Sequence, residues 1–411
     1  MAETEPNSKA GSEALAADLA AQRAEVPGGP TTEVPGAQRA EVPGGPGGPA
    51  TGASLETLGI LRRSIDEVDT QLLALLAQRA AIAKQVGHLK AGHHAPVWRP
   101  EREAAIIQRL RKENPGPLAA AAIDAIWREV ISACREVERR LQIAYLGPPG
   151  TFTELALLKQ FGQSVDALPC LSIDEVFRST ETGRADYGIV PVENSTEGAV
   201  NRSLDLMLQS PLRINGEVLL AIRHNLLRLG PSLEGIRTVY AHPQALAQCT
   251  AWLDRNLPLA QRLPVASNAE GARLAAASPE ASAIASESAA QRYGLDIAQS
   301  AIQDDPHNRT RFVVLGAQAC APSGADQTSL ILSVPDRAGA VHHLIEPLAR
   351  HGVSMKRFES RPARQGSWEY YFYIDILGHQ DDGEVAVALE ELRARAAFMK
   401  IVGSYPRAQE S

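Results

Sequence analysis

Long hydrophobic runs are missing from this 411-residue chain, and none is long enough to cross a membrane as a helix. We therefore expect no membrane partner. The N-terminus carries Glu3 and Glu5 and has no apolar core, a pattern that fits neither a secretory signal nor a transit peptide. These absences predict a cytoplasmic protein.

Cysteines are few: Cys134, Cys170, Cys249 and Cys320 are scattered, with no CxxC pair and no histidine at metal-ligand spacing. The pattern predicts free thiols and no metal site. The formal net charge of −7 disfavours nucleic acid as a partner.

Residues 1–53 have little apolar bulk and consist mainly of Ala, Glu, Pro and Gly, with the string AQRAEVPGGP starting at Ala21 and again at Ala37. Such a segment buries too little surface to offset its ordering entropy. We predict a disordered tail without an inferred role.

Apolar residues then recur in steps of three and four, which predicts one long helix with a heptad-like seam. The seam comprises Leu58, Leu61, Ile65, Val68, Leu72, Leu75, Ile82, Val86 and Leu89. Its missing position is Arg79, a cation that either meets an anionic ligand or pairs and snorkels locally. Helices over Arg99–Lys112 and Leu118–Leu141 complete an all-α domain at residues 54–142.

Short apolar runs alternate with helical patterns over residues 143–320, which predicts an α/β domain. The turn Gly147–Gly150 leads into a helix with Thr153 as its N-cap, a place where backbone amides can receive an anion. Expected strands are Ile143–Leu146, Tyr187–Val192, Glu217–Leu227, Thr238–Ala241, Ser282–Ala285 and Arg311–Leu315, and expected helices are Thr153–Phe161, Ile173–Thr180 and Gln244–Leu253.

A small polar linker, Ala317–Gln327, precedes a third domain at residues 328–405. Its pattern is strand, helix, strand, strand, helix, strand, the βαββαβ order of a ferredoxin-like domain. The elements are Thr328–Val334, Ala340–His351, Val353–Ser360, Trp368–Leu377, Glu384–Ala396 and Phe398–Gly403.

Residues 55–405 resemble the bifunctional chorismate mutase–prephenate dehydratases of phenylalanine biosynthesis. The resemblance rests on LRRSIDEVD, AQRA, GHLK, RPEREAA and CREVE in the helical part, then GPPGTFTE, GIVPVENSTEG, HPQALAQC and NRTRF. It implies an all-α mutase module, a two-lobed dehydratase domain like a periplasmic binding protein, and a ferredoxin-like ACT regulatory domain. It also implies chorismate and prephenate as substrates, no cofactor, and a homodimer or higher homo-oligomer.

For the mutase, the resemblance implies that Arg79, and Arg62 of a second copy, clamp the two carboxylates of chorismate. Lys90 would donate to the ether oxygen. The same motifs match substrate-binding positions at Arg102, Glu103 and Cys134.

Glu138 matches a family position that faces the same ether oxygen. A carboxyl group can donate a hydrogen bond only when protonated. This role predicts that mutase activity declines toward alkaline pH and that Glu138→Gln flattens the decline. The alternative is a surface glutamate paired with Arg135 or another basic neighbour.

For the dehydratase, the resemblance assigns Thr310 as the catalytic hydroxyl, which positions the leaving group or relays a proton. Asn194, Thr196 and Gln248 would hydrogen-bond substrate, and Thr151 with the amides of residues 150–153 would receive a carboxylate.

Three further side chains near these motifs have two interpretations each. Arg311 is either a carboxylate clamp or a strand-end pairing residue. Glu193 is either a proton donor or a structural pair. His242 fits a loop or core histidine better than a catalytic base.

The third domain resembles phenylalanine-sensing ACT domains, which pair and bind the amino acid at their interface. The matching effector residues are Gly339, Ala340 and Val341, whose amides can meet a carboxylate, and a turn of Glu359, Ser360, Arg361 and Pro362. The alternative is a dimerisation domain without a ligand.

Three functions fit this pattern. The first is a bifunctional enzyme with feedback by L-phenylalanine. The second is a dehydratase of prephenate or of arogenate with a vestigial helical module. The third is a non-catalytic amino-acid sensor. Arg62, Arg79, Lys90, Arg102 and Glu138 together favour the first over the second.

Overall fold

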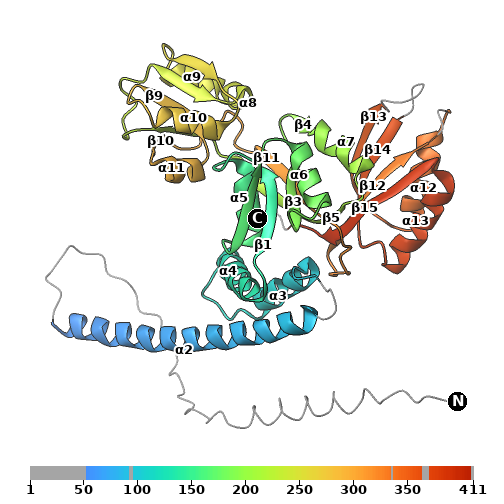
Figure 1. The fold of residues 1–411 in the computed structure, drawn as a ribbon, viewed down its shortest axis with the longest axis horizontal. Coiled ribbons are helices and arrows are strands. Elements are labelled where there is room, and N and C mark those ends of the chain that lie inside the picture. The colour runs from blue at the N-terminus through green and yellow to red at the C-terminus, as the bar shows by residue number, and fades with distance from the viewer. Residues whose placement is uncertain (1–51, 92–95, 335–336, 363–369, 409–411) are drawn as a thin grey trace, which may run out of the picture. The chain divides into compact units, whose positions relative to one another are not determined.

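A computed structural model describes residues 52–91, 96–334, 337–362 and 370–408 (Figure 1). The predicted disordered tail lies outside these ranges except for its last two residues, and residues 368–369 of the strand predicted over Trp368–Leu377 also lie outside them. The chain divides into two compact units, residues 1–66 and 67–411, and each is described by itself. No helix within the described ranges is long and apolar enough to cross a membrane.

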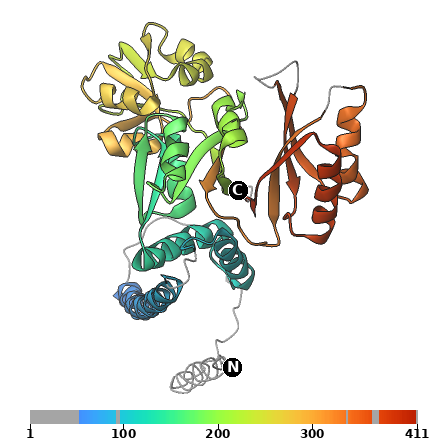
Figure 2. The same cartoon turned by 45° about the vertical axis from the view of Figure 1, so that its right-hand side comes forward.

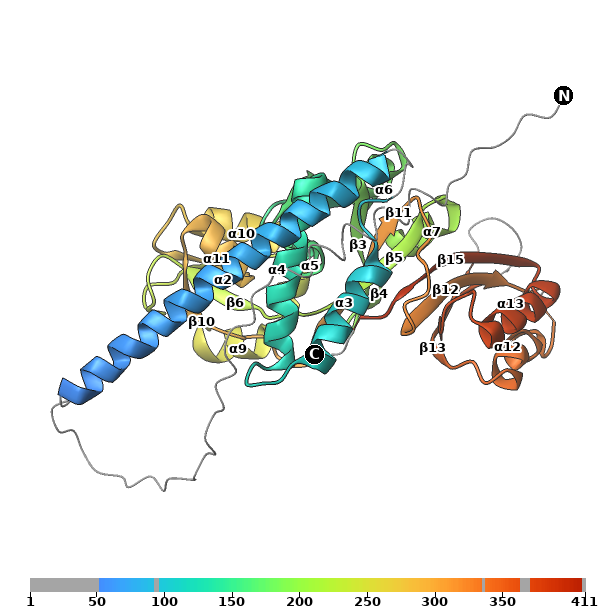
Figure 3. The same ribbon diagram turned by 90° about the horizontal axis from the view of Figure 1, so that it is seen from below.

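Three helices make up the described part of the helical domain. They are α2 (Gly52–Ala91), α3 (Pro100–Glu113) and α4 (Ala120–Glu138). Helix α2 is one uninterrupted helix (Figure 3). The prediction that the third helix extends to Leu141 was wrong, because Arg139 is already extended and Leu141 begins the first strand.

The apolar seam predicted along α2 faces solvent in the single chain. The exposed fraction of its large side chains ranges from 41% at Val86 to 70% at Leu89. An apolar face of this length on a solvent-exposed surface is typical of a protein–protein contact.

The α/β domain consists of two lobes, and lobe 1 contains a mixed sheet of order β2-β1-β3-β11-β5, with β4 paired to β3. Its strands are β1 (Leu141–Leu146), β2 (Val165–Cys170), β3 (Tyr187–Asn194), β4 (Gly198–Ala199), β5 (Arg213–Ala221) and β11 (Arg309–Gly316). Its helices are α5 (Phe152–Phe161), α6 (Ile173–Glu181) and α7 (Asn201–Gln209).

Lobe 2 contains a five-stranded sheet of order β10-β6-β9-β7-β8. Its strands are β6 (Asn225–Arg228), β7 (Thr238–Ala241), β8 (Gln261–Pro264), β9 (Ala281–Ala285) and β10 (Asp296–Gln299). Its helices are α8 (Pro243–Gln248), α9 (Thr250–Asn256), α10 (Asn268–Ala275) and α11 (Glu287–Tyr293).

The chain passes between the lobes twice, at residues 222–224 and 300–308. The single strand predicted over Glu217–Leu227 was therefore wrong: β5 belongs to the sheet of lobe 1 and β6 to that of lobe 2. The helix predicted over Gln244–Leu253 is likewise two short helices that meet at Cys249.

The C-terminal domain has the predicted βαββαβ order, with an antiparallel sheet of order β13-β14-β12-β15. Helices α12 and α13 pack side by side on one face of that sheet (Figure 2). The elements are β12 (Asp326–Ser333), α12 (Ala340–Arg350), β13 (Met355–Pro362), β14 (Tyr370–Leu377), α13 (Gly383–Arg395) and β15 (Phe398–Pro406).

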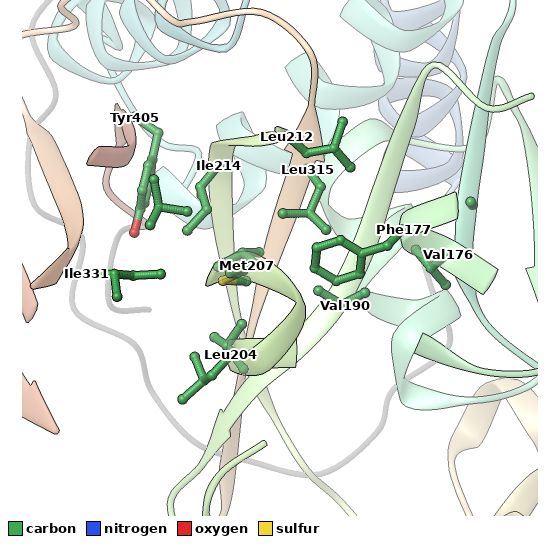
Figure 4. Packing of buried hydrophobic residues seen from close by; sticks show 14 of the residues in the cluster. Val176, Phe177, Val190, Leu204, Met207, Leu212, Ile214, Leu315, Ile331 and Tyr405 are labelled. Atoms are coloured by element: carbon green, nitrogen blue, oxygen red, sulfur yellow. The ribbon is translucent and has the colours of Figure 1, made fainter. Parts of the chain in front are cut away.

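One hydrophobic cluster joins lobe 1 to the C-terminal domain. Ile214 and Leu315 of lobe 1 belong to the same buried cluster as Ile331 and Tyr405 of the C-terminal sheet (Figure 4). A side chain at Gly403 of β15 would clash with the backbone of Ile214, so glycine permits the close approach of the two strands. The outer face of the C-terminal sheet is therefore fixed to the lobe that carries β11.

Candidate active sites

The helical domain contains a cavity of about 250 Å³ between residues 79–90 of α2, the start of α3, and α4. Six of the seven residues predicted for the mutase line it: Arg79, Lys90, Arg102, Glu103, Cys134 and Glu138. The seventh, Arg62, is an exposed residue of α2 in the first unit. The cavity is lined by five cationic side chains and two carboxylates, so its charge suits a small anion.

Lys90 and Glu138 meet at one end of this cavity. The ammonium Nζ of Lys90 donates to Oε1 of Glu138 at 3.1 Å and to Oε2 at 3.4 Å. The Glu138 side chain is only 10% exposed, and its basic partner is Lys90. A Cβ atom at Gly87 would lie 2.5 Å from Cγ of Glu138, so glycine on α2 makes room for the carboxylate.

Arg79 reaches the cavity from the middle of α2. Its Nη1 donates to the carbonyl of Val130 at 3.4 Å, and its guanidinium lies 5.9 Å from the centroid of the Trp127 ring. A carbonyl and a ring orient the guanidinium but leave its positive charge in place. The guanidinium of Arg79 therefore keeps an uncompensated positive charge inside the cavity.

Arg135 is a cavity residue that the sequence did not single out as part of the site. It pairs with Glu103 at 2.6 Å and donates to the Phe161 carbonyl at 2.5 Å. Trp98 Nε1 also donates to Glu103, at 3.2 Å. These contacts fix Glu103 and show that Arg135 is committed to it rather than to Glu138.

The α/β domain holds a cleft of about 870 Å³ with walls from both lobes. Thr151, Asn194, Gln248 and Thr310, all predicted to act on substrate, line it. Residues 148–153 form one wall, so the turn after β1 faces the cleft as the sequence predicts.

The helix after that turn begins earlier than predicted. Thr151, not Thr153, is the N-cap of α5, because its hydroxyl accepts the Glu154 amide at 3.5 Å. The Glu154 carboxylate in turn accepts the Gly150 amide at 2.5 Å. This hydrogen bond already uses one of the four amides predicted to receive a carboxylate.

A hydrogen-bond network orients Thr310. Oδ1 of Asn194 accepts the backbone amides of Thr196 and Glu197 at 3.0 and 3.2 Å. Its Nδ2 must then be the donor, and it reaches Oγ1 of Thr310 at 2.8 Å. With its oxygen accepting from Asn194, Thr310 has its own proton available for donation.

Two predicted substrate contacts lie elsewhere. Thr196 is exposed on the turn after β3, and the part of it that serves the site is its backbone amide. Arg311 lies on the opposite face of β11 from Thr310, because successive strand residues alternate between faces. The interpretation of Arg311 as a carboxylate clamp in the cleft is therefore wrong, and that of a pairing residue fits.

Arg311 joins lobe 1 to the C-terminal domain. Its guanidinium contacts Glu217 at 2.8 Å, Asp375 at 2.6 Å and the Tyr405 hydroxyl at 2.9 Å. Burial by itself would lower the pKa of Arg311, but Tyr405, Asp375 and Glu217 raise it well above its ordinary value. Arg311 therefore stays positively charged, and Glu217 and Asp375 compensate its charge inside the interface between lobe 1 and the C-terminal domain.

Glu193 and His242 also have structural partners. Glu193 pairs with Arg357 at 3.3 Å and lies 3.9 Å from Arg311, which favours the interpretation of a structural pair. His242 lines the cleft, and its Nδ1 accepts the Gln244 amide at 3.3 Å as the N-cap of α8. These contacts fit a structural pair for Glu193 and a loop histidine for His242.

The predicted effector residues lie in two elements of the C-terminal domain. Gly339 has a φ of 79° and is the N-cap of α12, and the Ala340 amide donates to Arg337 at 3.1 Å. Val341 packs against the domain core. The prediction of a turn at Glu359–Pro362 was wrong, because these residues end β13 and pair with residues 370–373 of β14.

In the described ranges, no group of histidine, cysteine or carboxylate side chains has the arrangement to hold a metal ion. The four cysteines are all buried free thiols.

Comparison with known proteins identifies all three domains. Residues 61–139 match the family of type II chorismate mutases, residues 143–320 the prephenate dehydratases, and residues 328–394 the ACT domains. A bifunctional chorismate mutase/prephenate dehydratase of Neisseria gonorrhoeae is 50% identical over 350 residues, which cover 84% of this chain and 96% of that relative. The chain belongs to the bifunctional chorismate mutase/prephenate dehydratase family. It is an enzyme of phenylalanine biosynthesis with both activities.

Other members of this family are similar over the same length. The enzyme of Aquifex aeolicus is 42% identical over 358 residues, covering 86% of this chain and 99% of its own. Among solved structures, the prephenate dehydratase of Arthrobacter aurescens in complex with L-Phe has a TM-score of 0.61 and is 35% identical. That match covers 66% of this chain and 92% of the other.

Proposed function

We propose that the cavity of the helical domain is the mutase site and that it rearranges chorismate by holding its compact conformer. Arg79, Arg102 and Arg62 of a second copy bind the carboxylates. Lys90 and protonated Glu138 donate to the ether oxygen as the C–O bond breaks. The proposal is supported above all by the convergence of six matched residues on one cationic cavity.

A homodimer is part of this proposal. The exposed apolar seam of α2 offers a surface for a second copy, and burying it removes large side chains from water. A dimer also supplies the second carboxylate clamp, since Arg62 is then contributed in trans.

In the dehydratase cleft, Thr310 donates its proton toward the leaving hydroxyl of prephenate while Asn194 holds the threonine oxygen. Gln248 and the amides that follow Gly150 bind the carboxylates and the ketone. Carbon dioxide and hydroxide leave together to give phenylpyruvate, with aromatisation as the driving force, and the hydroxide takes a proton from solvent to become water.

We further propose that L-phenylalanine binds between two ACT domains, at Gly339–Val341 and Glu359–Pro362, and inhibits the dehydratase. Contacts from the second segment to lobe 1 support this coupling. Arg361 pairs with Asp205 at 3.0 Å, and Arg357 bridges Glu359 and Glu193. An effector bound on β13 is therefore connected to lobe 1 by two ion-pair contacts.

The experiment that tests the whole proposal follows product formation from chorismate with and without phenylalanine. Phenylpyruvate is expected to form, and its rate to fall when phenylalanine is added. If the rate is insensitive to phenylalanine while calorimetry detects no binding, the ACT domain serves dimerisation only. Binding without any turnover would instead favour the amino-acid sensor.

Glu138→Gln tests the proton requirement of the mutase. The wild-type mutase rate is expected to decline toward alkaline pH, because an ionised carboxylate cannot donate to the ether oxygen. The glutamine amide donates at every pH, so the decline is expected to flatten in the variant. An alkaline limb of the same position and depth in both proteins would contradict the role of Glu138. Dehydratase activity measured with prephenate is the internal control for folding.

The domain limits 54–142, 143–320 and 328–405, with residues 1–53 as a tail, are our proposed division of the chain. Buried free thiols support a reducing compartment, so we place the enzyme in the cytoplasm.

A further inference from the structure

His224 lines the dehydratase cleft, yet no motif in the sequence points to it. It lies on the first crossover between the lobes, directly before β6, and is only 3% exposed. Its ring makes an edge contact with Phe152, with centroids 5.5 Å apart, and its backbone amide donates to Gln303 at 3.0 Å. The position and rotation of the ring are therefore fixed.

Hydrogen bonds fix the protonation of this histidine, starting from the backbone. Because Asn194 uses Oδ1 for two backbone amides, its Nδ2 donates to Oδ1 of Asn308 at 3.0 Å. Nδ2 of Asn308 must then be the donor to Oε1 of Gln248, at 3.0 Å. Oε1 of Gln248 also lies 2.9 Å from Nε2 of His224, so Nε2 carries the proton.

Among the described residues that line the cleft, two buried polar side-chain atoms have no hydrogen-bond partner. They are Nδ1 of His224, an acceptor in this tautomer, and Nε2 of Gln248, a donor. Both are buried, and both belong to side chains that line the cleft. A buried polar atom without a hydrogen bond is costly and rare in native proteins, so each needs a partner from outside the chain.

The substrate of the proposed dehydratase has complementary groups. Prephenate at neutral pH carries two carboxylates and a ketone, which only accept hydrogen bonds, and one hydroxyl, which is its sole donor. We propose that Nδ1 of neutral His224 accepts the hydroxyl of prephenate, and that Nε2 of the same ring holds Gln248 so that its amide group donates to a substrate oxygen. His224 is thus a substrate-binding and positioning residue, an inference that rests on the proposed dehydratase function.

The electrostatic setting keeps His224 neutral. Burial lowers its pKa below the ordinary 6.5, against a smaller opposite effect of the Gln248 hydrogen bond. The other titratable side chains that line the cleft are Cys170, His242 and Glu270. Since the neutral form binds the hydroxyl, dehydratase kcat/KM is expected to fall only as the pH drops below the ordinary histidine range.

Two substitutions test the roles of Nδ1 and Nε2 of His224 separately. In His224→Gln the side-chain amide reaches the position of Nε2 and still donates to Gln248, but the Nδ1 acceptor is lost. In His224→Asn the amide replaces Nδ1 and the hold on Gln248 is lost. We expect dehydratase kcat/KM to fall about tenfold in each, the factor typical of one lost hydrogen bond. The acid limb of the pH profile is expected to disappear in both.

Mutase activity of the same proteins, measured from chorismate, is the control for folding and is expected to stay at the wild-type value. Wild-type dehydratase kinetics in His224→Gln, or an unchanged acid limb, would overturn the proposal and leave Nδ1 facing a structural water. A wild-type chain without dehydratase activity would instead refute the proposed function, whatever the variants do. Equal losses of mutase and dehydratase activity would show that His224 acts on stability, which also overturns the proposal.

Discussion

Thr310→Val is expected to lower dehydratase kcat/KM by about a thousandfold, while the conversion of chorismate to prephenate keeps its wild-type rate. Valine has nearly the shape of threonine but no proton to give, so the change removes the donor and leaves the packing of β11 intact. Positioned proton donors contribute about 10²- to 10⁴-fold to reactions of this kind. The measurement is the formation of phenylpyruvate from prephenate, with chorismate consumption in parallel.

The chain offers a matched control in Thr196→Val. Thr196 carries the same hydroxyl and lies two residues from Asn194, but its side chain is exposed and only its amide takes part in the network. Its substitution is expected to change dehydratase activity less than twofold. Comparable losses in both variants would show that the network, and the role it gives Thr310, is wrong.

Arg311→Met is expected to destabilise the contact between lobe 1 and the ACT domain by about 3–5 kcal/mol. Arg311 is 12% exposed, and it compensates Glu217 and Asp375, whose side chains are 5% and 6% exposed. Methionine fills similar space but leaves two buried carboxylates without their cation. The measurement is the midpoint of thermal unfolding, which is expected to fall by several degrees.

Two comparisons make this prediction specific. Arg202→Met breaks the exposed pair with Asp174 and is expected to cost less than about 1 kcal/mol. Combining Arg311→Met with Glu217→Gln and Asp375→Asn removes the uncompensated charges and is expected to restore most of the lost stability. An Arg311→Met midpoint equal to that of Arg202→Met would contradict the account of the buried pairs.

The sequence predicted the domain architecture because each domain has its own periodicity. The three- and four-residue steps of α2 and the βαββαβ order of residues 328–405 depend on local patterns alone. The strand predicted over Glu217–Leu227 failed because two apolar runs flank residues 222–224, and no local signal shows that β5 and β6 belong to different sheets.

The motifs place Lys90 and Thr310 in the two sites, and both residues line the corresponding cavities, while their roles in the two reactions stay predictions. Of the two interpretations of Arg311, the carboxylate clamp failed: the motif places Arg311 beside Thr310, but strand alternation turns its side chain to the other face. The tautomer of His224 could not be predicted from the sequence, because it follows from hydrogen bonds among four segments far apart in the chain.

The central claim is that one chain carries two separate active sites, and mixing two inactivated variants tests it most directly. Lys90→Met removes the proposed donor to the ether oxygen and is expected to consume no chorismate at a measurable rate, yet to convert prephenate normally. Thr310→Val is expected to accumulate prephenate. Together, the two variants are expected to form phenylpyruvate from chorismate through released prephenate. If the mixture forms none, although each variant keeps its remaining activity, or if either single change abolishes both reactions, the account of two independent sites is contradicted.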